Sequence, residues 1–163
     1  MNAIHADVSI RDFQPGDEAS FRRLNEEWIT RYFVLEAKDR KSFDDPQSTI
    51  LNRGGRIFLA IENDQAVGCC ALVPIAPNEF EVAKMAVTPS SQGAGVGRRL
   101  LSKTIAEACS MGATRLYIET NHTLAPAIHL YESLGFKHIP YERVTPSPYA
   151  RADVYMELLL SAD

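Results

Sequence analysis

The sequence predicts an α/β (α+β) fold in which helices flank one central sheet of mixed, mostly antiparallel strands. Segments with the apolar pattern of strands alternate with segments in which apolar residues recur every three to four positions, as in helices. A chain of 163 residues, 45% of them hydrophobic, is long enough for one sizeable core and too short for two. We therefore expect a single domain over residues 1–163, with six to seven strands and about four helices.

The first third of the chain is expected to hold one strand and two helices. Residues 8–13 alternate apolar and polar side chains, which predicts a strand. Pro15-Gly-Asp17 then indicates a turn and a helix N-cap. The helix that follows has one apolar face, made of Phe21, Leu24, Trp28 and Tyr32. A second helix is expected over 34–41, and residues 43–55, which contain a proline and a Gly-Gly pair, are expected to form a loop.

The middle of the chain predicts three successive antiparallel strands, at residues 56–62, 66–74 and 79–87. Asn63-Asp64 is the turn between the first two. A helix over 95–111 follows and ends at Gly112, a residue type suited to a helix C-cap. Because this helix has to cross the sheet to reach the next strand, at 114–120, that strand is expected to be parallel to 79–87.

The last third is expected to hold one helix and two strands. The helix covers 125–134 and stops at Gly135. Strands are expected at 138–144 and 153–159, separated by a loop around Pro146-Ser-Pro148. The sequence contains no internal repeat, low-complexity tract or linker.

The composition excludes several classes of partner. The formal net charge is −4 and the pI is about 5.6, whereas nucleic acids and anionic membranes select strongly basic surfaces. No apolar run approaches the roughly 20 residues of a membrane span, and the N-terminus does not have the charged and then apolar pattern of a signal peptide. We therefore expect a cytoplasmic protein with no nucleic-acid and no membrane partner.

The cysteines and histidines predict neither a disulfide framework nor a metal site. Cys69 and Cys70 are adjacent in an expected strand, Cys109 lies in an expected helix, and none has a C-x-x-C partner. We expect all three to be small buried residues. His129 and Glu132 are three apart on a helix, but no second pair of ligands has the spacing of a metal site.

The loop between the strand at 79–87 and the following helix carries most of the functional information. It contains three glycines, Gly93, Gly95 and Gly97. Glycine has no Cβ, so a ligand can come close to this backbone. The first N–H groups of the helix have no partner within the helix and lie at the positive end of its dipole. Together with Arg98 and Arg99, they predict a site for phosphate or pyrophosphate, in preference to a merely flexible turn.

The spacing of the glycines excludes two common nucleotide-binding loops. A dinucleotide-binding loop requires G-x-G-x-x-G after the first strand, but Arg98 stands three residues after Gly95 and the loop lies in the middle of the chain. A phosphate loop of the NTPase type requires G-K-[ST], which is absent.

The segment Gln92-Gly-Ala-Gly-Val-Gly97 resembles the Q/R-x-x-G-x-G/A signature of the GNAT superfamily of N-acetyltransferases. The chain is similar to that family over about residues 8–160. The resemblance implies acetyl-CoA as cofactor, with its pyrophosphate held by Gln92, Gly93, Ala94, Gly95, Val96, Gly97 and Arg98. It also implies that the backbone of Met85, Ala86 and Val87 binds the pantetheine amides and polarises the thioester carbonyl.

A second motif, Ala127-Ile-His-Leu-Tyr-Glu-Ser-Leu-Gly-Phe136, resembles the family pattern A-x-x-L-Y-x-x-x-G-F. In the family this helix, here starting near Ala127, lies beside the pantetheine arm, and the tyrosine, here Tyr131, faces the sulfur. The resemblance implies that Tyr131 is the general acid that protonates the departing thiolate; the alternative is a tyrosine that fills the core. Many members have Asn seven residues before the tyrosine, where this chain has Leu124, and Asn121 is the candidate to replace that contact.

A carboxylate is the candidate for the base that removes a proton from the acceptor amine. Glu81 lies eleven residues before Gln92, the spacing at which several members of the family place a catalytic glutamate. Burial near Phe80 or Tyr131 could raise its pKa toward the working pH, whereas the alternative is a solvated carboxylate at a strand edge. Glu79 shares the same strand face, but the solvated alternative is favoured for it, and His122 is a further candidate base.

The family places the first two helices and the last hairpin around the acceptor, which here means Trp28, Arg31, Tyr32, Phe33, Glu36, Tyr141, Arg143, Tyr149 and Arg151. Among these, Arg31 or Arg151 could bind a substrate carboxylate and Glu36 an ammonium. Each of the three is more often an ordinary surface charge.

The resemblance predicts an acetyl-CoA-dependent N-acetyltransferase that transfers acetyl directly to a primary amine of a small molecule. One alternative is a protein or peptide N-acetyltransferase, and another is an acyl-CoA-binding sensor without turnover. An exposed final strand could also pair across a two-fold axis, which would give a homodimer.

Overall fold

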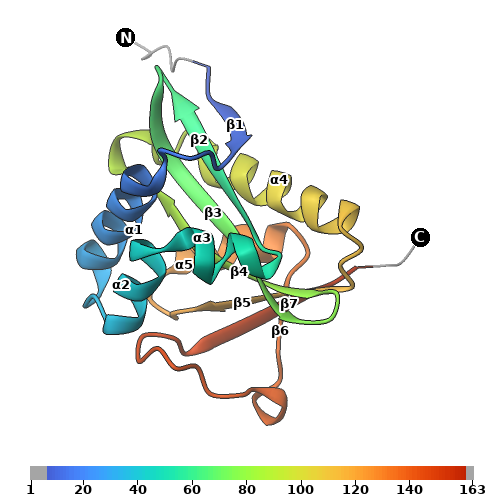
Figure 1. The fold of residues 1–163 in the computed structure, drawn as a ribbon. Coiled ribbons are helices and arrows are strands. Elements are labelled where there is room, and N and C mark those ends of the chain that lie inside the picture. Colours follow the sequence, from blue (N-terminus) through green and yellow to red (C-terminus); the bar gives the residue numbers. More distant parts are fainter. Residues whose placement is uncertain (1–6, 161–163) are drawn as a thin grey trace.

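The computed structural model describes residues 7–160, which form a seven-stranded sheet with helices on both sides (Figure 1). Residues 1–6 and 161–163 of the expected domain, and with them the N-terminal pattern that argued against a signal peptide, lie outside the described residues. The strand order is β1-β2-β3-β4-β5-β7-β6. The strands are Ser9–Asp12 (β1), Arg56–Glu62 (β2), Gln65–Ala76 (β3), Glu79–Val87 (β4), Arg115–Thr120 (β5), Lys137–His138 (β6) and Val154–Leu159 (β7). Among the described pairs, β4 and β5 are parallel and the others antiparallel, so the expected mixed, mostly antiparallel sheet is confirmed.

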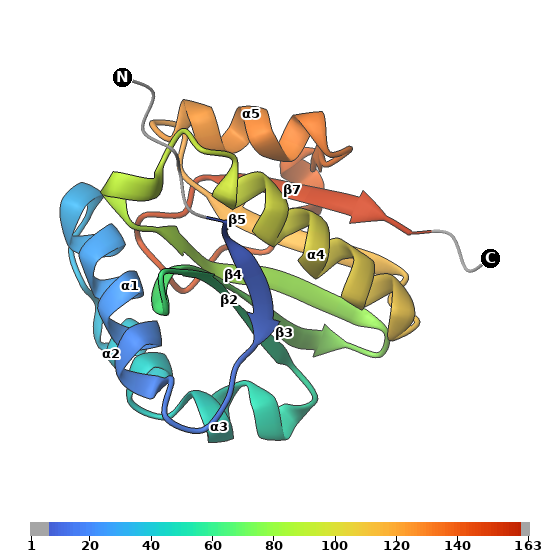
Figure 2. The same cartoon turned by 90° about the horizontal axis from the view of Figure 1, so that it is seen from above.

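Within residues 7–160, five α-helices flank the sheet, one more than expected. They are Glu18–Tyr32 (α1), Ala37–Asp44 (α2), Pro46–Thr49 (α3), Val96–Ser110 (α4) and Ala125–Ser133 (α5). Short 3-10 turns cover Leu51–Arg53, Pro89–Ser91 and Tyr141–Arg143. Figure 2 shows α1, α2 and α3 on one side of the sheet and α4 and α5 on the other.

The sheet has a hydrophobic core on each face. In β2, Ile57 and Leu59 join the core beneath α1, whereas Phe58 and Ala60 join the core beneath α4. Successive residues of a strand point to opposite faces, so a strand that is covered on both sides is apolar throughout. This double packing explains the continuous apolar run of β2 and holds the central strands as a fixed support for the loops at their ends.

The first two helices differ in detail from the expectation. Tyr32, expected on the apolar face of α1, is 42% exposed, whereas Ile29 is buried. The second helix was expected over 34–41 but covers Ala37–Asp44, because Glu36 is its N-cap and forms a capping box with Asp39.

Residues 43–55, expected to be a loop, fold instead into the end of α2, α3 and a 3-10 turn. The side chain of Asp45 accepts a hydrogen bond from the N–H of Ser48 at 3.0 Å, which caps the start of α3. Phe43 and Ile50 are buried beneath these short helices. That tertiary burial stabilises helical turns that the proline and glycine content of the segment does not predict.

The strand expected at 138–144 is wrong for most of its length. β6 ends at His138, and a 3-10 turn over Tyr141–Arg143 follows Pro140. Proline has no N–H to donate to a neighbouring strand, so pairing with β7 stops there. The chain then runs as an irregular segment from 144 to 153 before β7 begins.

The strands β4 and β5 separate along their length. They are paired only as far as Glu81 and Tyr117, although β4 continues to Val87 and β5 to Thr120. On its other side, β4 shifts register against β3, and Lys84 has a φ of 54°, a left-handed value that is rare for a residue with a side chain. The bulge and the separation leave the backbone of β4 beyond Glu81 unpaired with β5.

Replacing Gly55 with Ala should destabilise the fold by on the order of 3 kcal/mol, because overpacking a rigid site forces the backbone to move. A Cβ at Gly55 would lie 2.4 Å from the carbonyl oxygen of Leu72 and 2.7 Å from that of Ile50. The control is Gly97→Ala, where the new Cβ lies 3.7 Å from the side chain of Leu130. Urea denaturation of both variants tests the prediction, and equal stabilities would contradict it.

Candidate active site

The glycine loop joins the end of β4 to the start of α4. Gly95 is the N-cap of α4 with a φ of 81°, and Gly93 has a φ of 83°. Both values lie in the left-handed region, which glycine adopts without steric cost. A Cβ built at either position meets no atom within 4 Å, so the space beside the loop is open. The loop is tied back to β4 because the side-chain amide of Gln92 donates a 3.0 Å hydrogen bond to the carbonyl of Val87.

A groove of about 610 Å³ runs between this loop, β4, α1 and α5. It is lined by Trp28, Tyr32, Met85, Ala86, Val87, Ser91, Gln92, Gly93, Gly95, Val96, Gly97, Arg98, Thr123, Leu124, Pro126, Ala127, Leu130 and Tyr131. Most of the residues that the sequence suggested for the cofactor therefore come together in one place. Ala94 and Asn121 do not line the groove; Asn121 lines the neighbouring cavity and donates a hydrogen bond to the carbonyl of Arg151 at 2.8 Å.

The two arginines after the loop differ in position. Arg98 lines the groove, and its guanidinium donates a 2.8 Å hydrogen bond to the hydroxyl of Ser133 on α5. Arg99 is exposed and is not among the residues that line the groove. Nothing in the sequence distinguishes Arg98 from Arg99, because the direction of each side chain depends on how α4 packs.

Replacing Arg98 with Ala should weaken acetyl-CoA binding by about 5- to 30-fold, since a charge-assisted hydrogen bond contributes roughly 1–2 kcal/mol. Arg99→Ala removes the same charge from the next position, and its affinity should stay within about twofold of the wild type. Isothermal titration with acetyl-CoA at two salt concentrations makes the comparison. Equal losses in the two variants would show that only the net charge matters.

A second cavity, of about 120 Å³, lies where β4 and β5 separate. It is lined by Asn25, Trp28, Ile29, Phe33, Glu81, Val82, Ala83, Lys84, Met85, Glu119, Thr120, Asn121, Leu124, Tyr131, Tyr149, Arg151 and Ala152. Four residues line both the cavity and the groove, namely Trp28, Met85, Leu124 and Tyr131. The two spaces therefore meet at Tyr131.

Tyr131 is 8% exposed and packs against Phe136, with ring centroids 6.1 Å apart. Burial, with a smaller contribution from Cys70, raises the pKa of the Tyr131 phenol, so the hydroxyl stays protonated at neutral pH. This phenol is therefore a protonated group at the junction of the groove and the cavity.

Glu81 lines the cavity and is largely buried. Burial, and then the neighbouring carboxylate of Glu119, raises the pKa of Glu81 to about 8, while Lys84 acts in the opposite direction. The carboxylate oxygen Oε2 of Glu119 is buried and has no hydrogen-bond partner among the described residues. The two carboxyl groups thus form a pair on adjacent strands at the point where these strands part.

Sequence reasoning missed Glu119. The signal that could have found it is the register of the parallel pair: Glu81 lies beside Tyr117, so a glutamate two residues further along β5 points to the same face. That register depends on how α4 crosses the sheet, so the residues of β4 and β5 alone do not determine it.

The other candidate bases lie elsewhere. Glu79 is bound to Arg115 at 3.3 Å and lines neither the groove nor the cavity. His122, 72% exposed, is paired with Asp153 on the β5–α5 turn and also lines neither space. Their contacts are those of structural ion pairs.

Four of the expected acceptor residues line the small cavity, namely Trp28, Phe33, Tyr149 and Arg151. Tyr32 lines the groove instead. Arg31, Glu36, Tyr141 and Arg143 line neither space; Glu36 is bound by Arg151, and Arg143 is bound to Glu157. Arg151 and Glu36, which the sequence suggested as separate substrate contacts, therefore form an ion pair with each other.

The described residues also bear on the cysteines, on metal binding and on membrane-spanning helices. Cys69 and Cys70 are buried as expected, whereas Cys109 is exposed, which contradicts the expectation for that residue. In the part of the chain that the structure describes, no group of three or more His, Cys, Asp or Glu side chains is placed to hold a metal ion. No helix of residues 7–160 is long and apolar enough to span a membrane.

Comparison with known proteins agrees with this geometry. Residues 21–136 match the acetyltransferase (GNAT) family. The uncharacterized N-acetyltransferase YjgM of Escherichia coli is 32% identical over 96 residues, which cover 56% of this chain and 58% of the relative. The [ribosomal protein bS18]-alanine N-acetyltransferase of Salmonella typhimurium is 34% identical over 93 residues, covering 56% of this chain and 63% of the relative.

Solved structures share the whole fold. An acetyltransferase of the GNAT family from Staphylococcus aureus has a TM-score of 0.86 at 19% sequence identity, and the match covers 95% of this chain and 100% of the other. The matches to the curated relatives above are shorter and span about six tenths of the relatives' length. The family match over residues 21–136 covers most of the chain and contains the glycine loop and Tyr131. The chain belongs to the GNAT acetyltransferase family.

Proposed function

We propose that the protein transfers the acetyl group of acetyl-CoA directly to a primary amine of a small molecule. The observation that carries this proposal is the junction at Tyr131, where the groove beside the glycine loop opens into a small cavity that contains two buried carboxyl groups. A groove of about 610 Å³ suits a large cofactor, and a cavity of about 120 Å³ with two carboxyl groups suits a compact cation.

The residues of the groove fit acetyl-CoA. The amides of residues 92–97 and the guanidinium of Arg98 would hold the pyrophosphate, which needs the open space that Gly93 and Gly95 leave. Beyond Glu81, β4 is unpaired with β5, so Met85, Ala86 and Val87 can offer backbone groups to the pantetheine amides. Ala127 lines the same groove from α5.

The reaction requires one group that accepts a proton and one that donates a proton. In the proposed reaction the amine nitrogen forms a bond with the acetyl carbon as the carbon–sulfur bond breaks. Glu81 takes the proton that the ammonium loses, and Tyr131 gives its proton to the departing thiolate. Burial and, after it, the negative charge of Glu119 raise the pKa of Glu81 to about 8, which suits a base that works near neutral pH.

The size and charge of the cavity support a compact acceptor. The cavity, of about 120 Å³, is much smaller than the groove of about 610 Å³. The carboxyl groups of Glu81 and Glu119 favour a group that enters as an ammonium. Aromatic rings of Trp28, Phe33 and Tyr149 complete the wall.

The α-amine of a peptide is the second candidate acceptor. It is favoured by the relative from Salmonella typhimurium, whose name identifies an alanine of a ribosomal protein as its substrate. Because the cavity is small, it would accept the N-terminal residue of a peptide only if the rest of the peptide can extend out of the cavity.

The test is an acceptor panel with product detection by mass. The purified protein is mixed with acetyl-CoA and with amino acids, polyamines, aminoglycosides, simple alkylamines and peptides that begin with Ala. Acetylation of compact amines at a higher kcat/KM than any peptide supports the proposal. A preference for peptides would move the function to the second candidate, and tight acetyl-CoA binding without any turnover would mean a sensor.

A further inference from the structure

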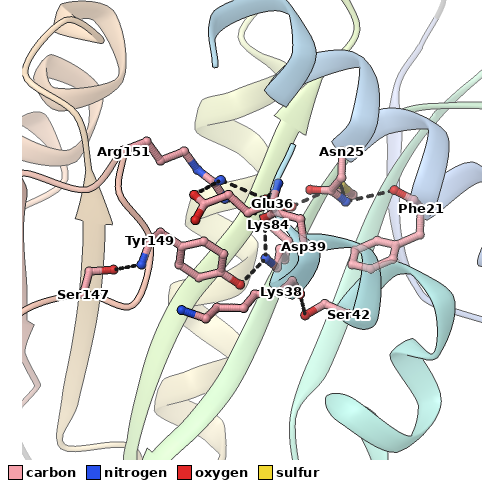
Figure 3. A network of polar contacts seen from close by, with 11 residues as sticks. Phe21, Asn25, Glu36, Lys38, Asp39, Ser42, Lys84, Ser147, Tyr149 and Arg151 are labelled. Carbon is pink, nitrogen blue, oxygen red and sulfur yellow. Dashed lines mark hydrogen bonds and ion pairs between the residues drawn. The ribbon is translucent and has the colours of Figure 1, made fainter. Parts of the chain in front are cut away.

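A buried carboxylate outside the proposed reaction organises one wall of the acceptor cavity. Asp39, in the first turn of α2, has a side chain that is 0% exposed. It lines neither the cavity nor the groove, so it has no place in the chemistry proposed above. Figure 3 shows it at the centre of a polar network that joins α2, β4 and the segment before β7.

Two cations converge on this carboxylate. The guanidinium of Arg151 donates two hydrogen bonds to Asp39, at 2.6 and 2.9 Å, in the bidentate geometry that is strongest for such pairs. The same guanidinium reaches Glu36 at 3.3 Å. The ammonium of Lys84 lies 3.5 Å from Asp39 and is 11% exposed. Two carboxylates and two cations therefore balance each other around the fully buried side chain of Asp39.

These cations are also the wall of the cavity. Lys84 sits on the bulge of β4, and Arg151 lies in the irregular segment that precedes β7; both line the cavity together with Tyr149. The Tyr149 ring stacks under Arg151, 4.5 Å from its Cζ, and its hydroxyl accepts a hydrogen bond from Lys84 at 3.3 Å. Asn121, directly after β5, donates a 2.8 Å hydrogen bond to the carbonyl of Arg151.

The network has two consequences for a ligand. It fastens residues 148–151 to α2, because Lys38, next to Asp39, also donates a 2.7 Å hydrogen bond to the carbonyl of Pro148. It also neutralises Lys84 and Arg151, which would otherwise place two positive charges beside the space meant for an ammonium. Holding residues 148–151 against α2 closes the cavity and so restricts the length of the acceptor. Neutralising Lys84 and Arg151 allows the acceptor to be a cation.

We propose that Asp39 is a positioning residue that closes and neutralises the acceptor cavity by holding Arg151 and Lys84, and so restricts the acceptor to compact cationic amines. The proposal rests on the acetyltransferase function proposed above for its substrate class. The closure itself does not depend on that function and can be measured without turnover.

The experiment compares Asp39→Asn and Arg151→Gln with the wild type. Asp39→Asn removes the charge at nearly constant volume, and Arg151→Gln opens the same contact from the other side if the first variant does not fold. Arg40→Gln is the matched control, because Arg40 is exposed on the same helix and lines neither space. Hydrogen exchange of the backbone over residues 147–152 reports closure, and steady-state kinetics with a compact amine and an Ala-initiated tetrapeptide report selection.

The proposal predicts that the backbone amides of residues 147–152 exchange faster in Asp39→Asn and in Arg151→Gln than in the wild type. In Arg40→Gln they should exchange at the wild-type rate. For Asp39→Asn it also predicts that KM for the compact amine rises by at least about tenfold while kcat changes by less than about threefold, since Lys84 and Arg151 are then uncompensated charges beside the ammonium. The ratio of tetrapeptide to compact-amine activity should rise.

Unchanged exchange in both variants would overturn the closure, and a loss of kcat at unchanged KM would overturn the positioning role. If the wild type acetylates no amine at all, the function proposed above fails, and the exchange data still decide whether Asp39 holds this wall.

Discussion

Replacing Tyr131 with Phe should lower kcat by about 10²- to 10⁴-fold, the usual contribution of a general acid. The variant keeps the ring and its contact with Phe136, 6.1 Å between centroids, and loses only the hydroxyl. Stability and acetyl-CoA affinity should therefore stay as in the wild type. The measurement is the rate of CoA release at saturating acetyl-CoA and amine, beside a titration of acetyl-CoA.

Tyr141→Phe is the matched control for this prediction. Tyr141 is 89% exposed and lines neither the groove nor the cavity, so its kcat should be that of the wild type. A Tyr131→Phe enzyme with full kcat would show that the thiolate takes its proton from water, and the role proposed for Tyr131 would be withdrawn.

Replacing Glu81 with Gln should lower kcat/KM for the amine by about 10²- to 10⁴-fold, because the variant cannot accept the proton of the ammonium. The kcat/KM of the wild type should rise with pH, reach half its maximum near pH 8 and level off above it, since burial and Glu119 raise the pKa of Glu81 to about 8 and only the deprotonated carboxylate is a base. Below that value the rate should fall by about tenfold per pH unit.

Glu119→Gln separates the two causes of the raised pKa. It removes the like charge and leaves the burial of Glu81, so the inflection of the pH profile should move below 8 while remaining above the ordinary range of a glutamate. The groups that face Glu81 besides Glu119 are Lys84 and Tyr117, and both are kept. A kcat profile that is flat from pH 6 to 9, or an inflection that Glu119→Gln does not move, would exclude Glu81 as the base.

The parts of the site that lie close together in the sequence could be predicted from it. The glycine loop, the end of β4 and the start of α4 form one continuous segment, and glycine at 93 and 95 carries the left-handed φ values that the loop needs. Local chemistry fixes this geometry, because only glycine adopts such φ values freely. The hairpin turn at Asn63 and Asp64, with φ of 51° and 62°, is predictable for the same reason.

The parts that depend on distant contacts could not be predicted. Glu119 joins the site because β4 and β5 pair in one particular register and then separate. Asp39 is bound by a residue more than a hundred positions away, and no pattern in α2 marks it as different from its neighbours. The segment 144–153 has neither helical nor strand spacing, so its place against α2 depends on the ion pair of Arg151 with Asp39 and on the hydrogen bond from Lys38 to the carbonyl of Pro148.

The most direct test of the account is a single turnover of the protein loaded with acetyl-CoA. The complex is mixed with the preferred amine and quenched at intervals, and mass spectrometry follows the acetyl group on CoA, on the amine and on the intact protein. Direct transfer at the junction of groove and cavity predicts that acetyl-amine appears at the rate at which acetyl-CoA disappears, that the protein mass never increases by an acetyl group, and that Glu81→Gln and Tyr131→Phe slow both changes equally. An acetylated protein that forms and decays at the rate of turnover, or a failure of acetyl-CoA to bind, would contradict it.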